Sequence, residues 1–82
     1  MKVSIAIPCY NEESTILEIV RRVKKLKIHK EIIVVDDCSS DNSYNIARKI
    51  KGIKLFKHKE NKGKGAAVKT ALKHATGDIF LV

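Results

Sequence analysis

The sequence is poor in several residue types that mark common classes of protein. It has no tryptophan and one proline, and aromatic residues make up 5% of its 82 residues. No run approaches the roughly 18 apolar residues that a membrane-spanning helix needs, and the first residues form a run of β-formers without the layout of a signal peptide. We therefore expect one small cytoplasmic domain.

Cysteine is also scarce, with Cys9 and Cys38 as the two examples and no Cys-x-x-Cys spacing. Two thiols alone make a poor zinc site, so we expect reduced packing residues. The alternative is a disulfide or shared metal, since each cysteine follows a predicted strand. The three histidines, His29, His58 and His74, have no partners at ligand spacing, and the sequence assigns them no chemistry.

Acidic residues are outnumbered, with 9 Asp and Glu against 17 Lys and Arg and a formal net charge of +8. Such an excess suggests nucleic acid or an anionic surface as partner. However, most basic residues fall on predicted helix exteriors or an edge strand, and the aromatics that nucleic-acid-binding modules use for stacking are few. We expect solvated basic surface and no nucleic acid, with an acidic or phosphorylated partner, or a basic nucleic-acid-binding module, as alternatives.

Four runs of β-formers alternate with three helical patterns. Strands are predicted at residues 3–8, 31–36, 53–58 and 78–82, with a helix between each successive pair. This order predicts an α/β fold with parallel strands and right-handed crossovers. Because lysines in the third run would protect a sheet edge, the simplest strand order is 3-2-1-4.

Local signals predict where these elements begin, end and pack. Pro8 is expected to close the first strand, Asn11 to cap the first helix, and Ser40 or Asp41 to cap the second. The first helix should end near Lys27, and the second near residue 51, before Gly52. The predicted buried stripes are Ile16, Ile19, Val20, Val23 and Leu26, then Tyr44, Ala47 and Ile50, then Val68, Ala71, Leu72 and Ala75.

Two short acidic segments follow the first two strands: a first elbow at residues 8–13 and a second elbow at residues 35–41. Both should lie at the carboxyl ends of neighbouring parallel strands, where open α/β sheets bind ligands. Neither elbow has the glycines of a dinucleotide-binding turn, and residues 63–66 do not form a P-loop. Recognition must therefore use side chains: Asp37 for a base N–H, Glu12 for ribose hydroxyls and Tyr10 for packing.

Four segments, residues 3–13, 31–41, 61–67 and 75–78, together resemble the N-terminal nucleotide-binding half of family 2 glycosyltransferases. The resemblance is closest to dolichyl-phosphate or polyprenyl-phosphate mannosyl- and glucosyltransferases. It implies the GT-A fold, whose first half is Rossmann-like with three layers. Cys38 departs from the pattern, because the family more often has glycine there.

The resemblance implies six nucleotide-binding residues: Pro8, Tyr10, Glu12, Val35, Asp36 and Asp37. Val35 would contact the base, and Asp36 would be an orienting carboxylate or, alternatively, a structural acceptor for backbone N–H groups. Asn61 and Lys64 would approach phosphates at the start of the third helix, with a plain turn and a solvated lysine as the alternative. No residue of the chain is assigned a catalytic role.

The implied activity is transfer of a sugar from a UDP- or GDP-sugar to an acceptor such as polyprenyl phosphate, by inverting displacement. The Asp-x-Asp that holds a divalent metal (Mg or Mn) is expected beyond Val82, with the catalytic base further on. We therefore expect a truncated N-terminal portion that binds the nucleotide but is inactive alone. A polyprenyl-phosphate acceptor would place the complete enzyme at the cytoplasmic face of a membrane.

A receiver-like signalling domain is a competing hypothesis, because a strand ending in Asp36 and Asp37 also resembles its magnesium-binding acid pair. That fold requires a phosphorylated Asp at the end of the next central strand. The later candidates are Glu60, in a predicted turn, and Asp78, which begins its strand.

Overall fold

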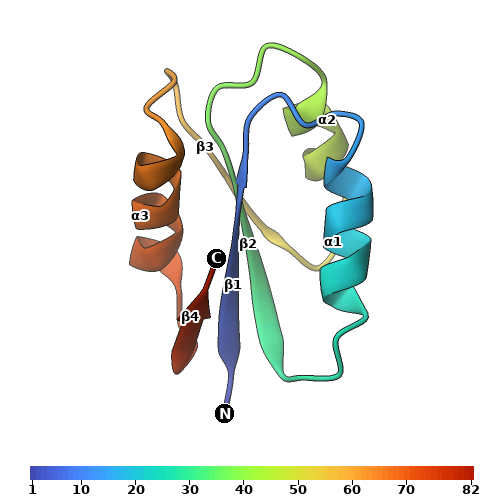
Figure 1. Ribbon diagram of the computed structural model, residues 1–82, viewed down its shortest axis with the longest axis vertical. Helices are drawn as coiled ribbons and strands as arrows, with labels where there is room; N and C mark the ends of the chain where they lie inside the picture. The colour runs from blue at the N-terminus through green and yellow to red at the C-terminus, as the bar shows by residue number, and fades with distance from the viewer.

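The computed structural model describes residues 1–82 as a four-stranded parallel sheet with helices on both faces (Figure 1). The strands run in the order β3-β2-β1-β4, which confirms the predicted α/β class and the order 3-2-1-4. The strands are β1 (Val3–Cys9), β2 (Lys30–Asp36), β3 (Lys54–Lys57) and β4 (Ile79–Leu81), and the helices are α1 (Ile16–Lys24), α2 (Ser43–Arg48) and α3 (Lys64–His74).

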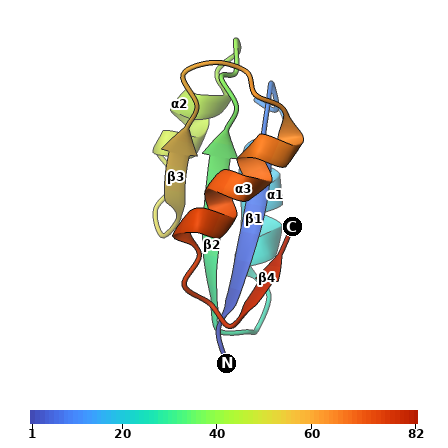
Figure 2. The same cartoon turned by 90° about the vertical axis from the view of Figure 1, so that its left-hand side faces the viewer.

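The two faces of the sheet are covered differently. Helices α1 and α2 lie on one face, while α3 alone crosses the other, over β1 and β2 (Figures 1 and 2). Under α1 and α2 the core contains Ile16, Val20 and Ala47 packed with strand residues. Under α3 it contains Ala67 and Ala71. The continuous apolar character of β1 and β2 follows from this burial on both faces.

The buried face of α3 differs from the predicted stripe. Ala67 and Ala71 are fully buried, whereas Leu72 is 55% exposed. The helix lies close to the sheet because its contact residues are alanines, and the larger side chains flank the contact. On α1, Ile16 and Val20 are buried as predicted, but Leu26 lies beyond the end of the helix at Lys24 and is exposed.

Pro8 does not close β1, which continues to Cys9. The backbone N–H of Asp37 donates to the carbonyl of Cys9 at 2.8 Å, so Cys9 faces β2. Because successive residues of a strand face opposite neighbours, the nitrogen of Pro8 faces the other side. There β4 pairs only with residues Val3 to Ile5, so the missing N–H of Pro8 costs no sheet hydrogen bond.

The predicted cap of α1 is wrong, whereas that of α2 is correct in part. Thr15 precedes α1 and Asn42 precedes α2, and neither side chain makes a capping hydrogen bond. Asn11 hydrogen-bonds to Ser40 across the elbows, but Asp41 accepts the backbone N–H of Ser43, the first residue of α2, at 2.9 Å. Both helices end earlier than predicted. Helix α1 ends at Lys24 instead of near Lys27, and α2 ends at Arg48 instead of near residue 51.

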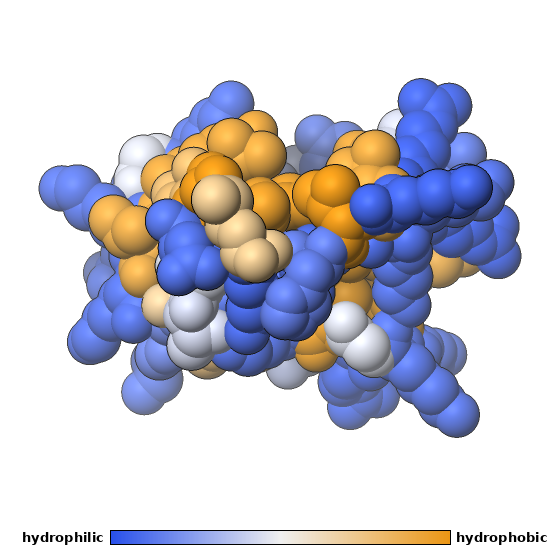
Figure 3. Space-filling model, turned by 90° about the horizontal axis from the view of Figure 1, so that it is seen from below, coloured by the Kyte–Doolittle hydropathy of each residue, from blue (hydrophilic) through white to orange (hydrophobic).

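The end of the molecule where β1 and β2 begin shows apolar side chains among hydrophilic ones (Figure 3). Leu26 and Ile28, in the connection from α1 to β2, are 49% and 46% exposed. None of the three helices combines the length and the apolar composition required to span a membrane.

Candidate functional site

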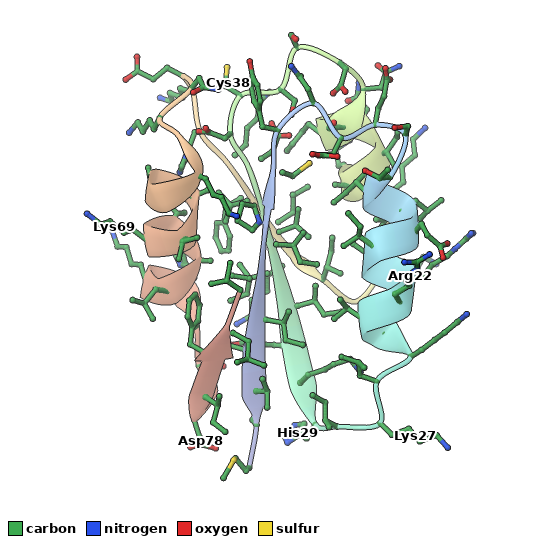
Figure 4. All side chains as sticks on the ribbon, viewed as in Figure 1. Arg22, Lys27, His29, Cys38, Lys69 and Asp78 are labelled. Carbon is green, nitrogen blue, oxygen red and sulfur yellow. The ribbon has the colours of Figure 1, made fainter.

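Three connections converge where the central strands end. Pro8 is paired with Val35 and Cys9 with Asp36, so β1 and β2 end side by side, and both elbows leave the sheet there, beside the β3–α3 connection (Figures 1 and 2). Cys38 marks this end in Figure 4, and His29 marks the opposite one.

A cavity of about 420 Å³ lies at this convergence. Its lining includes six of the eight residues that the sequence proposes for a nucleotide site, from both elbows and from the β3–α3 connection. The lining residues are Pro8, Cys9, Tyr10, Glu12, Asp37, Asn61, Gly63, Lys64 and Ala67. The structure therefore brings together the residues proposed for the base, the ribose and the phosphates.

Val35 and Asp36, the other two proposed residues, lie beneath this cavity and are fully buried. Val35 packs in the core under α3. The carboxylate of Asp36 accepts hydrogen bonds from the backbone N–H and the hydroxyl of Ser39, at 3.0 and 2.6 Å. Asp36 thus acts as a structural acceptor that closes the turn of the second elbow, and Val35 does not line the cavity.

Asn11 joins the two elbows. It adopts a left-handed backbone conformation with φ of +52°, which asparagine tolerates better than most residues. Its side-chain oxygen accepts hydrogen bonds from the backbone N–H and the hydroxyl of Ser40, at 2.8 and 3.2 Å. The backbone N–H of Glu12 donates to the hydroxyl of Ser43 at 2.7 Å. These bonds hold Tyr10 and Glu12 in a fixed position relative to the second elbow.

Asp41 strengthens the same junction. One oxygen accepts from the backbone and hydroxyl of Ser43, and the other accepts the backbone N–H of Glu13 at 3.2 Å. Although desolvation opposes ionisation, these hydrogen bonds lower the pKa of Asp41 below its ordinary value. Asp41 is therefore an anchor between the elbows.

Asp37 is the buried carboxylate of the cavity, with 3% exposure. It accepts the backbone N–H of Lys62 at 2.9 Å and that of Gly63 at 2.7 Å, which ties the β3–α3 connection to the end of β2. The hydrogen bond from Lys62 outweighs burial and, together with His58 and Gly63, lowers the pKa of Asp37. Gly63 has φ of +94°, a conformation that favours glycine.

His58 belongs to this site, contrary to the expectation that it has no chemistry. Its ring is 9% exposed, with Nδ1 2.8 Å from Oδ1 of Asp37 and Nε2 2.7 Å from the hydroxyl of Thr70. These contacts are not apparent in the sequence, because Asp37 and Thr70 are separated from His58 by 21 and 12 positions. The available signal was its place after the third strand, at the same end of the sheet as the elbows.

The remaining lining is more open to solvent. Tyr10 is 48% exposed, and its ring forms one side of the cavity. The carboxylate of Glu12 accepts the hydroxyl of Thr15 at 2.7 Å and keeps its other oxygen free of protein donors. Lys64 is the first residue of α3 and is exposed. An aromatic ring, two carboxylates and a lysine suit a polar ligand that has N–H groups, hydroxyls and negative charge.

Both cysteines are free. Burial raises the pKa of the Cys9 thiol to about 11, with nearby Asp36 adding to the effect, so Cys9 is an unreactive part of the cavity wall. Cys38 has φ of +61°. That conformation explains why glycine suits this position, as the resemblance to family 2 implies.

The described residues contain no group of three or more His, Cys, Asp or Glu side chains that could hold a metal ion. The acids of the elbows accept protein N–H and O–H groups instead. They do not fit a metal centre, and we assign no chemical step to one within these residues.

Comparison with known proteins decides the family. The model of the family described as glycosyl transferase family 2 matches residues 4–82. The chain belongs to glycosyl transferase family 2. This membership confirms the resemblance and leaves no support for the receiver-like or nucleic-acid-binding alternatives.

Curated members of family 2 share about a third of their aligned residues with the chain. It is 36% identical to a dolichol-phosphate mannosyltransferase of Pyrococcus furiosus, over 100% of this chain and 25% of that protein. It is 35% identical to the poly(ribitol-phosphate) β-N-acetylglucosaminyltransferase TarS of Staphylococcus aureus, over 99% of this chain and 15% of that protein. The chain thus spans a quarter or less of these two relatives.

Solved structures of family 2 proteins confirm the GT-A type of fold. The mannosyltransferase PcManGT of Pyrobaculum calidifontis, in complex with GDP-Man and Mn²⁺, has a TM-score of 0.89 and 31% identity, over 95% of this chain and 25% of that chain. Residues 1–349 of S. aureus TarS, in complex with UDP-GlcNAc, also have a TM-score of 0.89, with 34% identity over 99% of this chain and 25% of that chain.

Proposed function

We propose that residues 1–82 form the nucleotide-binding part of a glycosyltransferase that uses a nucleotide-diphospho-sugar as donor. The observation that carries this proposal is the cavity at the ends of β1 and β2, where a family 2 chain places Tyr10, Glu12 and Asp37 together. The structures of two solved relatives are complexes with such donors, GDP-Man and UDP-GlcNAc.

Five of the lining residues have side chains whose chemistry supports a role in binding the donor. Asp37 accepts an N–H of the base, and the unoccupied oxygen of Glu12 accepts a ribose hydroxyl. The exposed ring of Tyr10 packs against the base or the sugar. Asn61 and Lys64 lie beside the first turn of α3, where backbone N–H groups and a lysine favour the diphosphate.

The acceptor is proposed from the relatives, and the location from the chemistry of that acceptor. Similarity to a dolichol-phosphate mannosyltransferase supports a polyprenyl phosphate as acceptor. Because such a lipid is held in a membrane, the complete enzyme would act at a membrane surface, for which we propose the cytoplasmic face. In inverting displacement, an ionised phosphate oxygen of the acceptor would bond to the sugar as the bond between the sugar and the nucleoside diphosphate breaks. A base would be needed only where the acceptor oxygen carries a proton. The presence of Mn²⁺ in the PcManGT structure supports a divalent metal for the complete enzyme, with ligands supplied from outside the cavity described here.

Isothermal titration of the full-length protein with UDP and GDP tests this proposal. Asp37→Ala should weaken nucleotide binding by roughly 1 to 3 kcal/mol, because a donor of the base is left unpaired. Since Asp37 also anchors the β3–α3 connection, Tyr10→Ala provides a second variant at an exposed side chain that makes no hydrogen bond in the protein. Glu60→Ala, an exposed acid outside the cavity, is the matched control. Equal affinities for all four proteins would refute the proposed site.

A further inference from the structure

The two oxygens of Asp37 are not equally available to a ligand. Oδ1 receives both Nδ1 of His58, at 2.8 Å, and the backbone N–H of Lys62, at 2.9 Å. Oδ2 receives only the backbone N–H of Gly63, at 2.7 Å. A carboxylate oxygen accepts about two hydrogen bonds, so Oδ1 is saturated and Oδ2 keeps one acceptor position.

The surroundings of His58 hold its ring in place, so the hydrogen bond from Nδ1 to Oδ1 of Asp37 is maintained. An ionised carboxylate can only accept, so the proton between the two groups belongs to Nδ1 of His58. The ring cannot turn freely, because it is nearly buried and its Nε2 is held by the hydroxyl of Thr70 at 2.7 Å. Its backbone is fixed as well, since the N–H of His58 donates to the carbonyl of Asp36 at 2.9 Å.

We propose that His58 is a positioning residue that determines base specificity: it occupies Oδ1 of Asp37, leaves a single acceptor for the base, and thereby selects uracil over guanine. This inference rests on the proposed function, in which Asp37 faces the base. Similarity leaves the base open, because the solved relatives include one with GDP-Man and one with UDP-GlcNAc.

The hydrogen-bonding edges of the two bases explain the selection. Uracil presents one N–H, at N3, between two carbonyl groups, and a single acceptor satisfies it. Guanine presents N1–H and the N2 amino group side by side, which match both oxygens of a carboxylate. Against Asp37, the second guanine donor would meet an oxygen that already has two partners, and it would be buried without a hydrogen bond.

The test is the ratio of the dissociation constants for GDP and UDP, measured by isothermal titration of the full-length protein in one buffer. We expect UDP to bind at least about tenfold more tightly than GDP, the effect of one unpaired donor. His58→Phe keeps a ring of similar size but removes the N–H, so Oδ1 becomes available and the ratio should fall to about 2 or below. This shift in selectivity is a change that mere loss of stability would not produce.

Three further variants separate positioning from structure. His58→Asn retains a donor that can take the place of Nδ1, and it should keep most of the tenfold preference. Thr70→Val removes the partner of Nε2 with little change in shape, and it should lower the ratio partly; this variant serves as the test if His58→Phe does not fold. His29→Asn, at the opposite end of the molecule (Figure 4), should leave the ratio unchanged.

The possible failures are distinguishable. If GDP binds the unaltered protein as tightly as UDP, or if the ratio is unchanged in His58→Phe and Thr70→Val, the role of His58 is refuted while the proposed function stands. If neither nucleotide binds the unaltered protein, the proposed function itself is refuted.

Discussion

The side chain of Glu31 links β2, on which it lies, to β1, to β3 and to the α3–β4 connection, so removing its charge should destabilise the fold. The side chain is 8% exposed. One oxygen accepts the hydroxyl of Ser4 on β1 at 2.5 Å and both the backbone N–H and the hydroxyl of Thr76, at 2.6 and 3.1 Å. The other oxygen lies 2.6 Å from Nζ of Lys54 on β3 and 3.7 Å from Nζ of Lys2.

The substitution Glu31→Gln keeps the shape of the side chain but removes its charge. The ion pair with Lys54, whose side chain is 43% exposed, contributes at most about 1 kcal/mol. The hydrogen bonds from Ser4 and Thr76 to the carboxylate weaken, and the amide N–H₂ of glutamine faces at least one donor. We therefore expect a loss of about 2 to 3 kcal/mol in the free energy of unfolding.

The pH dependence of this loss provides a second criterion. Although desolvation opposes ionisation, the hydrogen bonds from Lys54, Ser4 and Thr76 hold the pKa of Glu31 well below its ordinary value of 4.5. A carboxyl with a lowered pKa stabilises the folded state above its unfolded pKa, and this contribution is lost as the pH falls through the folded pKa. The difference between the unaltered protein and Glu31→Gln should be full at pH 7 and decrease steadily below about pH 4.5.

The assay is denaturant unfolding followed by circular dichroism at several pH values. The matched control is Glu18→Gln, which removes an exposed ion pair with Arg22 on α1 and should cost less than about 0.5 kcal/mol. If Glu31→Gln were as stable as the control, or if its deficit did not change between pH 7 and pH 3, the role assigned to this carboxylate would be wrong.

Three further substitutions test the backbone and the elbows. Gly77→Ala should destabilise the fold by about 2 kcal/mol or more, because the added Cβ would lie 2.6 to 2.8 Å from atoms of Lys2 and Ser4; Gly65→Ala, in α3 with open space around it, should not lower the melting temperature. Cys38→Gly should raise the melting temperature, because the strain relieved at a positive φ outweighs the weak hydrogen bond from Sγ to the carbonyl of Lys59; an unchanged or lower value would contradict this. Asn11→Ala should lower the free energy of unfolding by about 1 to 2 kcal/mol and weaken nucleotide binding, whereas intact binding in titrations would show that the elbows stay aligned without it.

The sheet was predictable because its signals are local. The apolar runs of β1 and β2 indicate burial on both faces, and Lys54 and Lys57 mark β3 as an edge. Strand order and parallel direction then follow from the alternation of strands and helices. The convergence of Tyr10, Glu12 and Asp37 also follows, because neighbouring parallel strands end at the same side of the sheet.

Other features depend on contacts between distant residues. Asn11 has the composition of a helix cap, but its side-chain oxygen bonds across the elbows, so this cap was assigned wrongly. Asp41 accepts the backbone N–H of Ser43 at the start of α2, as predicted, and its other oxygen bonds across the elbows to Glu13. Leu72 fits a helical stripe as well as Ala71 does, and only the closeness of α3 to the sheet determines which is buried. His58 gains its role from Asp37 and Thr70, which no spacing in the sequence joins.

The most direct test of the proposed site is a crystal structure of the full-length protein with UDP. We predict that the base lies against Asp37 and Tyr10, with a ribose hydroxyl near Glu12 and the diphosphate near the first turn of α3. The chief competing location is the larger cavity of about 720 Å³ between α1 and α2, lined by the basic residues Arg21, Lys24, Arg48 and Lys49. A nucleotide bound there, with the cavity of the elbows vacant, would contradict the account.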